Sequence, residues 1–161
     1  MKNKRSINKN PVNMIDISDK NFTKRRAKAS VKIFMPPAVI RKIKLGLLPK
    51  GDCLDTARVA AILAAKNTPL IIPLCHSLQL AYVGVDFKLT GNNITIVAQA
   101  RAHYATGVEM EALSACAVAA LTIYDMAKTE TGDIVITDLK LLEKTGGKSG
   151  DYRIKNMADK D

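Results

Sequence analysis

The feature that most constrains the fold is a run of residues without charge at positions 112–124. It lies inside a longer stretch, 108–128, whose length and content of Ala, Leu and Met are typical of a helix. Because about 20 consecutive apolar residues are needed to cross a bilayer, the run is too short for a membrane span. We therefore predict a helix that is buried in the core of a globular domain.

Regular patterns on both sides of this helix predict the other elements. Apolar and polar residues alternate in four segments, which predicts strands at 28–35, 80–89, 94–104 and 134–142. The Gly-Asn-Asn turn at 91–93 joins the second and third strands as a hairpin. Helical patterns occupy 38–45 and 52–66, and an apolar loop that contains prolines follows at 69–76.

This order of elements predicts an α+β fold, the ferredoxin-like βαββαβ sandwich, with an antiparallel sheet and helices on one face. We interpret the strands as apolar on both faces, so we expect a second subunit to cover the open face of the sheet. The chain has 161 residues, the length of one domain. We predict a single domain at 14–151, a basic flexible tail at 1–13 and a C-terminal tail at 152–161.

Composition narrows the class of protein. Hydrophobic residues make up 47% of the chain and charged residues 25%, which excludes a disordered protein. The three cysteines, Cys53, Cys75 and Cys116, form no Cys-x-x-Cys pair, and nothing at the N-terminus resembles a secretory signal. We therefore expect a cytoplasmic protein.

Positive charge is concentrated in the first third of the chain. Residues 1–50 contain 14 Lys and Arg but only two acids, Asp16 and Asp19. Such a segment attracts nucleic acid, an anionic membrane or a small polyphosphate. A nucleic-acid-binding module is therefore one alternative, although the chain has no Trp and lacks the aromatic signature with which such sheets stack bases. A non-catalytic assembly subunit is another alternative.

Charged residues stand at both ends of the predicted core helix. Asp125 and Lys128 are one turn apart near its C-terminal end, where a carboxylate and an amine can act as an acid/base pair. Their spacing alone favours an ordinary surface ion pair. Glu109 and Glu111 lie in the first turn, where acids suit the helix dipole.

Two further segments are candidates for a site. His76 follows Cys75 in the loop at 69–76, where it either faces a pocket or serves as a hydrogen-bonded structural residue. With His103 they lack the paired spacing of a zinc site, so no metal site is predicted. The segment GGKSG at 146–150 lacks the first glycine of a Walker motif, but Lys144 and Lys148 can serve a mobile loop that closes over an anion.

Several segments together resemble the cyclic pyranopterin monophosphate synthase family of molybdenum-cofactor biosynthesis. The matching blocks span residues 14–151 in the family's order and are MIDIS at 14–18, KGD at 50–52, TAR at 56–58, IPLCH at 72–76, TGVEMEAL at 106–113, LTIYDM at 121–126 with Lys128, and GGKSG at 146–150 followed by Asp151. Ser77 departs from the family pattern, which usually has proline after the loop histidine.

The resemblance implies a lyase whose substrate is 3′,8-cyclo-7,8-dihydroguanosine triphosphate. This small nucleotide-derived molecule is rearranged to cyclic pyranopterin monophosphate with release of pyrophosphate. The resemblance also implies a homohexamer, a trimer of dimers, with active sites between subunits. No cofactor is expected apart from Mg²⁺ that the triphosphate can carry, and neither nucleic acid nor a membrane is expected as a partner.

The matching positions also imply site residues. Catalytic roles fall on Asp125, Lys128 and Lys50. Substrate-binding roles fall on nine residues from the loop at 69–76, the start of the core helix and basic positions near strand ends: Leu74, Cys75, His76, Glu109, Met110, Glu111, Arg25, Lys144 and Lys148. Lysine and arginine suit a triphosphate because they make charge-assisted hydrogen bonds to its oxygens.

Overall fold

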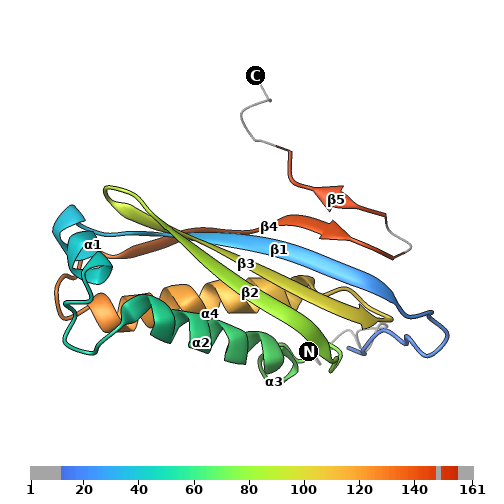
Figure 1. Cartoon of the computed structure of the whole chain (residues 1–161). Helices are drawn as coiled ribbons and strands as arrows, with labels where there is room; N and C mark the ends of the chain where they lie inside the picture. Colours follow the sequence, from blue (N-terminus) through green and yellow to red (C-terminus); the bar gives the residue numbers. More distant parts are fainter. Residues whose placement is uncertain (1–11, 148–149, 156–161) are drawn as a thin grey trace, which may run out of the picture.

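The computed structural model describes residues 12–147 and 150–155. A twisted antiparallel sheet forms one layer, and two long helices lie side by side along one of its faces (Figure 1). The elements in chain order are β1 (Thr23–Phe34), α1 (Pro37–Lys44), α2 (Cys53–Lys66), α3 (Thr68–Ile71), β2 (Leu80–Leu89), β3 (Asn93–Tyr104), α4 (Glu109–Ala127), β4 (Val135–Thr145) and β5 (Tyr152–Arg153). Across the sheet the strands follow the order β2-β3-β1-β4-β5. The predicted ferredoxin-like α+β fold is confirmed.

Several boundaries differ from the sequence prediction, and β4 continues to Thr145 where residue 142 was expected to end it. Strand β1 begins at Thr23 and not at residue 28, because the backbone of its basic start pairs with both neighbours: Arg25 lies opposite Ala102 of β3, and Arg26 lies opposite Thr145 of β4. The apolar loop at 69–76 begins inside a helical turn, α3, with a proline in its first turn. The short strand β5 lies in the segment expected to be a C-terminal tail, and it pairs with the end of β4.

Small side chains dominate the contact between sheet and helices. The buried face of β1 carries Ala27 and Ala29, and that of β3 carries Ala98 and Ala100. Helix α4 packs against both strands and buries several alanines of its own. Alanine on both sides lets the helix approach the sheet closely and leaves little spare volume. By length and composition alone, α4 would suffice for a membrane span. Half of it is buried inside the protein, however, and this burial agrees with the predicted core helix.

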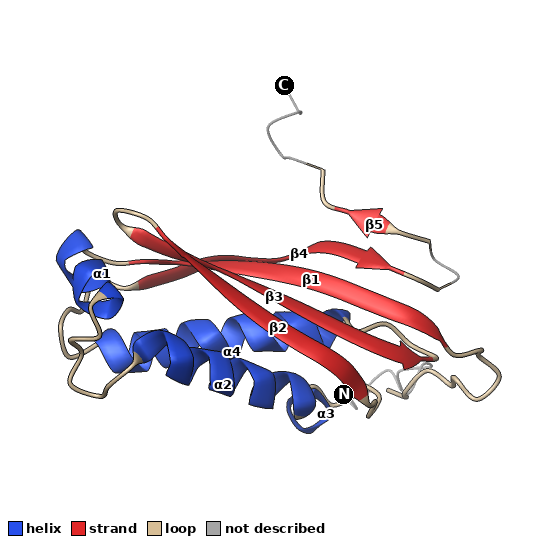
Figure 2. Ribbon diagram, viewed as in Figure 1, coloured by secondary structure: helices blue, strands red, loops and turns tan. Residues whose placement is uncertain are grey.

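The other face of the sheet is not the apolar surface that the sequence suggested. Within the described residues no helix covers it (Figure 2), and its central strand β1 presents Arg26, Lys28 and Lys32. Glu143 pairs with Arg26 at 3.0 Å and with Lys28 at 3.4 Å. The expectation of apolar residues on both faces was wrong because Ala, Val and Ile of β1 and β3 fall mostly on alternate positions, and these all point toward the helices.

Candidate active site

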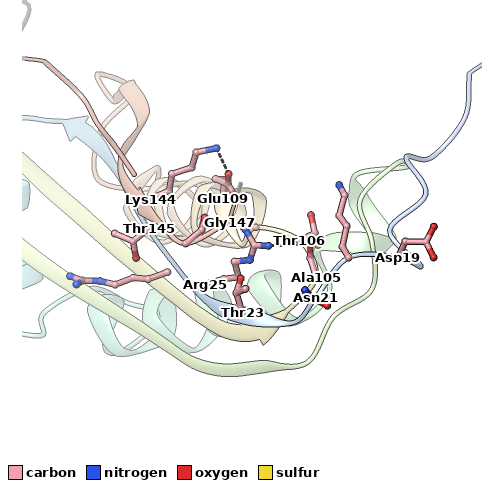
Figure 3. A pocket seen from close by; sticks show the side chains of 14 residues that line it. Asp19, Asn21, Thr23, Arg25, Ala105, Thr106, Glu109, Lys144, Thr145 and Gly147 are labelled. Carbon is pink, nitrogen blue, oxygen red and sulfur yellow. Dashed lines mark hydrogen bonds and ion pairs between the residues drawn. The ribbon is translucent and has the colours of Figure 1, made fainter. Parts of the chain in front are cut away.

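Two adjoining cavities lie at the end of the molecule where α4 begins. The first has a volume of about 590 Å³ and is lined by basic side chains from three segments: Lys20 before β1, Arg25 and Arg26 of β1, and Lys144 of β4. Glycines 146 and 147 and the loop from residue 105 to 107 complete its wall (Figure 3). The concentration of positive charge suits an anionic ligand.

The second cavity is less polar and has a volume of about 580 Å³. Its wall contains Leu74, Cys75 and His76 from the loop after α3, Met110 from α4, and apolar residues of the segment before β1. Four residues line both cavities: Lys20, Thr106, Gly107 and Glu109. A ligand with a charged end and a flat, less polar end could therefore occupy both.

Arg25 ties together the loops around the first cavity. Its guanidinium donates hydrogen bonds to the main-chain oxygens of Tyr104 at 3.2 Å, Ala105 at 3.2 Å and Gly146 at 3.1 Å. Gly147 adopts a φ of +94°, and a β-carbon there would collide with this guanidinium. Three of the five N–H groups are thus engaged by backbone, so Arg25 shapes the cavity as well as contributing charge.

Lys144 and Glu109 form an ion pair between β4 and the start of α4. The distance from Lys144 Nζ to Glu109 Oε1 is 2.8 Å (Figure 3). The side chain of Lys144 is 31% exposed and that of Glu109 is 26% exposed. An anion that enters the first cavity would compete with Glu109 for the ammonium group.

Glu111 is almost completely buried, with 1% of its surface exposed. The thiol of Cys75 donates a hydrogen bond to Glu111 Oε1 at 3.6 Å, whereas Oε2 has no partner among the described residues. Burial raises the pKa of Glu111, and burial together with the nearby carboxylate raises the pKa of Cys75 to about 11. Cys75 is therefore a thiol at neutral pH and no nucleophile.

The second group of predicted residues lies at the opposite end of α4. Asp125 Oδ1 lies 2.7 Å from Lys128 Nζ, and Asp125 Oδ2 lies 2.5 Å from Lys50 Nζ, which belongs to the loop between α1 and α2. Hydrogen bonds from Lys128 and then Lys50 lower the pKa of Asp125 to about 2, and the same contact raises the pKa of Lys128. Asp125 is therefore a carboxylate and Lys128 a protonated amine across the neutral range.

One chain thus brings the predicted residues together in two groups and not in one. From Glu109 to Asp125, α4 advances by about 24 Å at 1.5 Å per residue. Lys148 lies outside the described residues. Within residues 12–147 and 150–155, no group of three His, Cys, Asp or Glu side chains is placed to hold a metal ion.

Sequence reasoning assigned no role to the segment before β1, although four of its side chains line the second cavity: Asn13, Ile15, Ile17 and Lys20. A signal was present, because residues 14–18 formed one of the blocks that resemble the family. Ile15 and Ile17 alternate with polar residues, but the alternation is too short to predict an element, so the pattern gave no reason to place these residues at a site.

The fold and the cavities define a class of protein: an antiparallel α+β protein with a site for a small anionic molecule. The chain belongs to the MoaC family, whose pattern matches residues 14–147. The resemblance drawn from the sequence blocks is confirmed.

Curated relatives agree with this family. The chain is 47% identical over 139 residues to the cyclic pyranopterin monophosphate synthase of Streptomyces avermitilis, which covers 86% of this chain and 82% of the relative. It is 49% identical over 144 residues to the protein of the same name from Oleidesulfovibrio alaskensis, covering 88% and 91%. It is also 49% identical over 143 residues to that of a Nostoc species, covering 86% and 84%. None of these names supports the nucleic-acid-binding alternative.

Proposed function

We propose that this chain is a cyclic pyranopterin monophosphate synthase, a lyase of molybdenum-cofactor biosynthesis that acts on 3′,8-cyclo-7,8-dihydroguanosine triphosphate. The observation that carries the proposal is the pair of joined cavities, one cationic and one less polar, in a chain that belongs to the MoaC family. The triphosphate fits the cationic cavity beside Lys144, and the fused ring system fits the cavity that contains His76 and Met110.

Ring opening and closure require groups that donate and accept protons. Lys20 and Glu109 also line the less polar cavity, but we assign this role to His76. Lys128 is the matching candidate at the other end of α4. Its contact with Asp125 raises its pKa, so the amine is protonated at rest and carries the positive charge and the proton into the reaction. Expulsion of pyrophosphate while a sugar hydroxyl attacks the remaining phosphate requires positioning and charge stabilisation, which the lysines supply.

A complete site on this scheme needs two copies of the chain. A catalytic group must come within about 3 Å of the reacting atom, and a nucleoside triphosphate does not span the 24 Å or so between the ends of α4. If two chains pair with their α4 helices antiparallel, the Asp125 end of each copy meets the His76 end of the other. Each two-fold pair would then hold two sites.

The outer surface of the helices suits such pairing. Val59 and Leu63 of α2 and Leu121 and Tyr124 of α4 are exposed although they are large and apolar. An apolar patch of this kind marks an interaction surface. It supports a homohexamer, a trimer of dimers, in which the helical layer and not the charged sheet face forms the contact between paired subunits.

The remaining expectations form part of the same proposal. Residues 14–151 constitute the catalytic domain, with a tail at 1–13 and a C-terminal segment at 152–161 that begins with β5. The enzyme works in the cytoplasm without nucleic acid or a membrane as partner. No cofactor is required, except that Mg²⁺ can accompany the triphosphate. Turnover in excess EDTA tests that point.

The activity is tested by incubating the purified chain with 3′,8-cyclo-7,8-dihydroguanosine triphosphate and measuring pyrophosphate and the cyclic pterin product. Release of both in equal amounts supports the proposal. Binding without pyrophosphate release would favour the non-catalytic assembly role, and RNA binding without turnover would favour the nucleic-acid module. Sedimentation should give a mass close to six times the 17.5 kDa of one chain.

The shared site is tested by mixing inactive variants. Asp125→Asn damages the group at the C-terminal end of α4, and Lys144→Ala damages the group at its N-terminal end. In a two-fold pair with one copy of each variant, one site receives both damaged groups and the other site is intact. Half of the pairs are mixed, and activity should return to about a quarter of the wild-type value. Asp125→Asn mixed with Lys128→Ala is the matched control, because both changes damage the same end and no site is restored. Equal results for the two mixtures would refute the shared site.

A further inference from the structure

The segment that precedes β1 has no part in the core, yet it lies along both cavities. Among its described residues, 12–22, most side chains are exposed, including Met14 and Ile15, and none is fully buried. Ile15 and Ile17 line the second cavity, Asp19 lines the first, and Lys20 lines both. A segment that buries so little and still follows the cavity walls is placed to serve the site and not the stability of the fold.

One contact links this segment to a predicted site residue. The distance from His76 Nε2 to the main-chain oxygen of Ile15 is 2.8 Å. A carbonyl oxygen only accepts hydrogen bonds, so Nε2 must carry the hydrogen. In the neutral imidazole the lone pair then resides on Nδ1, and no hydrogen bond to Nδ1 is made by the described residues.

A turn around Asp16 holds the Ile15 carbonyl in place. Asp16 Oδ1 accepts hydrogen bonds from the main-chain nitrogen of Ser18 at 2.9 Å and from Ser18 Oγ at 2.6 Å. The main-chain nitrogen of Lys20 donates to Ile17 O at 3.0 Å and closes the next turn. A side chain that accepts from the backbone two residues on fixes the local chain direction. The bonds from Ser18 also lower the pKa of Asp16, so the acceptor is a carboxylate.

We propose that residues 13–20 are a positioning element of the site: the Asp16 turn presents the Ile15 carbonyl to His76, keeps the hydrogen on Nε2 and leaves Nδ1 as the proton acceptor toward the bound ring. Asp16 is a positioning residue in this scheme, because it acts on the ligand only through His76. The role in turnover rests on the proposed function, but the state of the imidazole is a property of the resting protein and is measured without substrate.

The test uses the full chain labelled with ¹⁵N in its histidines, with His103→Asn made to assign the two imidazoles. Wild-type protein should show His76 protonated on Nε2, with a hydrogen that exchanges slowly with water. Asp16→Ala should lose this slow exchange. Asp16→Asn should retain it, because an amide oxygen can accept the same bonds from Ser18. Asp19→Ala, a change in the same segment that leaves both bonds between Ser18 and Asp16 in place, should leave the imidazole signal as it is.

Kinetics provide the second readout. Asp16→Ala should lower kcat by about 10- to 100-fold, as expected when a reacting group is misplaced, with a much smaller change in KM, and Asp16→Asn should restore it. Hydrogen on Nδ1 in the wild type, or slow exchange that survives Asp16→Ala, would overturn the proposal. Ser18→Ala repeats the test at the donor side if Asp16→Ala does not fold. An absence of turnover in wild-type protein with the expected imidazole signal would refute the proposed function alone.

Discussion

Lys50 Nζ lies 2.5 Å from Asp125 Oδ2 and also donates to the main-chain oxygen of Asp125 at 3.2 Å. This contact joins the loop before α2 to the last turn of α4. Because a second ammonium group, that of Lys128, reaches the other carboxylate oxygen, the negative charge of Asp125 is shared between two cations. Asp125 therefore orients the lysines and does not serve as a proton donor near neutral pH.

The first prediction concerns this cluster. Asp125→Asn and Lys128→Ala should each lower turnover by about 10²–10⁴-fold if Lys128 acts in proton transfer and Asp125 orients it, and the double variant should be little worse than the poorer single one. Turnover and sedimentation are measured together, so that a folded oligomer is verified. Glu130→Gln is the control: Glu130 forms an ion pair with Lys42 at 2.5 Å, also near the end of α4, and its removal should leave turnover nearly unchanged. Near-normal turnover of Asp125→Asn would contradict the catalytic role assigned to Asp125.

The second prediction uses the buried carboxyl of Glu111. Burial raises its folded-state pKa, so the folded chain binds the proton more tightly than the unfolded chain does. Its contribution to stability is complete below the unfolded pKa of about 4.3 and is lost as pH rises through the folded pKa. The side chain of Glu111→Gln does not titrate, so this variant does not lose that stability. The difference in unfolding free energy, variant minus wild type, should therefore increase as pH rises above 4.

Urea unfolding of both proteins at one fixed concentration measures this difference. Glu111→Asp, which keeps the titration but shortens the side chain, serves as a comparison. A difference that stays constant with pH would mean that Glu111 is ionised in the folded chain.

The third prediction concerns the close approach of Gly147 to Arg25. Alanine at this position meets both an unfavourable φ of +94° and the guanidinium that binds three main-chain oxygens. Gly147→Ala should lower the unfolding free energy by about 1–3 kcal/mol. Gly132→Ala is the control, since a β-carbon there has open space around it and should change stability by less than about 0.5 kcal/mol. Thermal unfolding of both variants decides the matter, and equal effects would show that the contact with Arg25 is unimportant.

The fourth prediction separates the basic N-terminus from the positioning element. Deletion of residues 1–10 should change turnover by less than about threefold, because this stretch carries charge without apolar anchors. Deletion of residues 1–20 should abolish most of the activity, because it also removes the carbonyl that contacts His76. A large loss from the shorter deletion would mean that the first ten residues contribute to the phosphate site.

Sequence patterns predicted the order of elements well because alternation in β2 and β3 and the long uncharged helix are strong local signals. They missed the start of β1, since Lys24, Arg25 and Arg26 hide the alternation that burial imposes further along the strand. The charged sheet face was missed for a related reason. The apolar residues were assigned to both faces, whereas the register of β1 and β3 places most of them on the face that contacts the helices.

The sequence named candidate site residues one by one but could not give their arrangement. The ion pair of Asp125 and Lys128 follows from their spacing on a helix, whereas the approach of Lys50 across 75 positions does not. No local pattern indicates that Glu111 is buried, that Arg25 donates to three carbonyls, or that Ile15 reaches His76. These contacts depend on how distant segments meet, which only tertiary structure determines.

Helix α4 fixes the distance between the two groups of predicted site residues. It carries Glu109 at one end and Asp125 near the other, and its buried alanines pack closely against the sheet. A single residue inserted into its exposed face would rotate one end against the other by about 100° and lengthen the helix by about 1.5 Å. Insertions and deletions in this helix would therefore be far less tolerated than substitutions on its outer surface, even where every side chain of the site is retained.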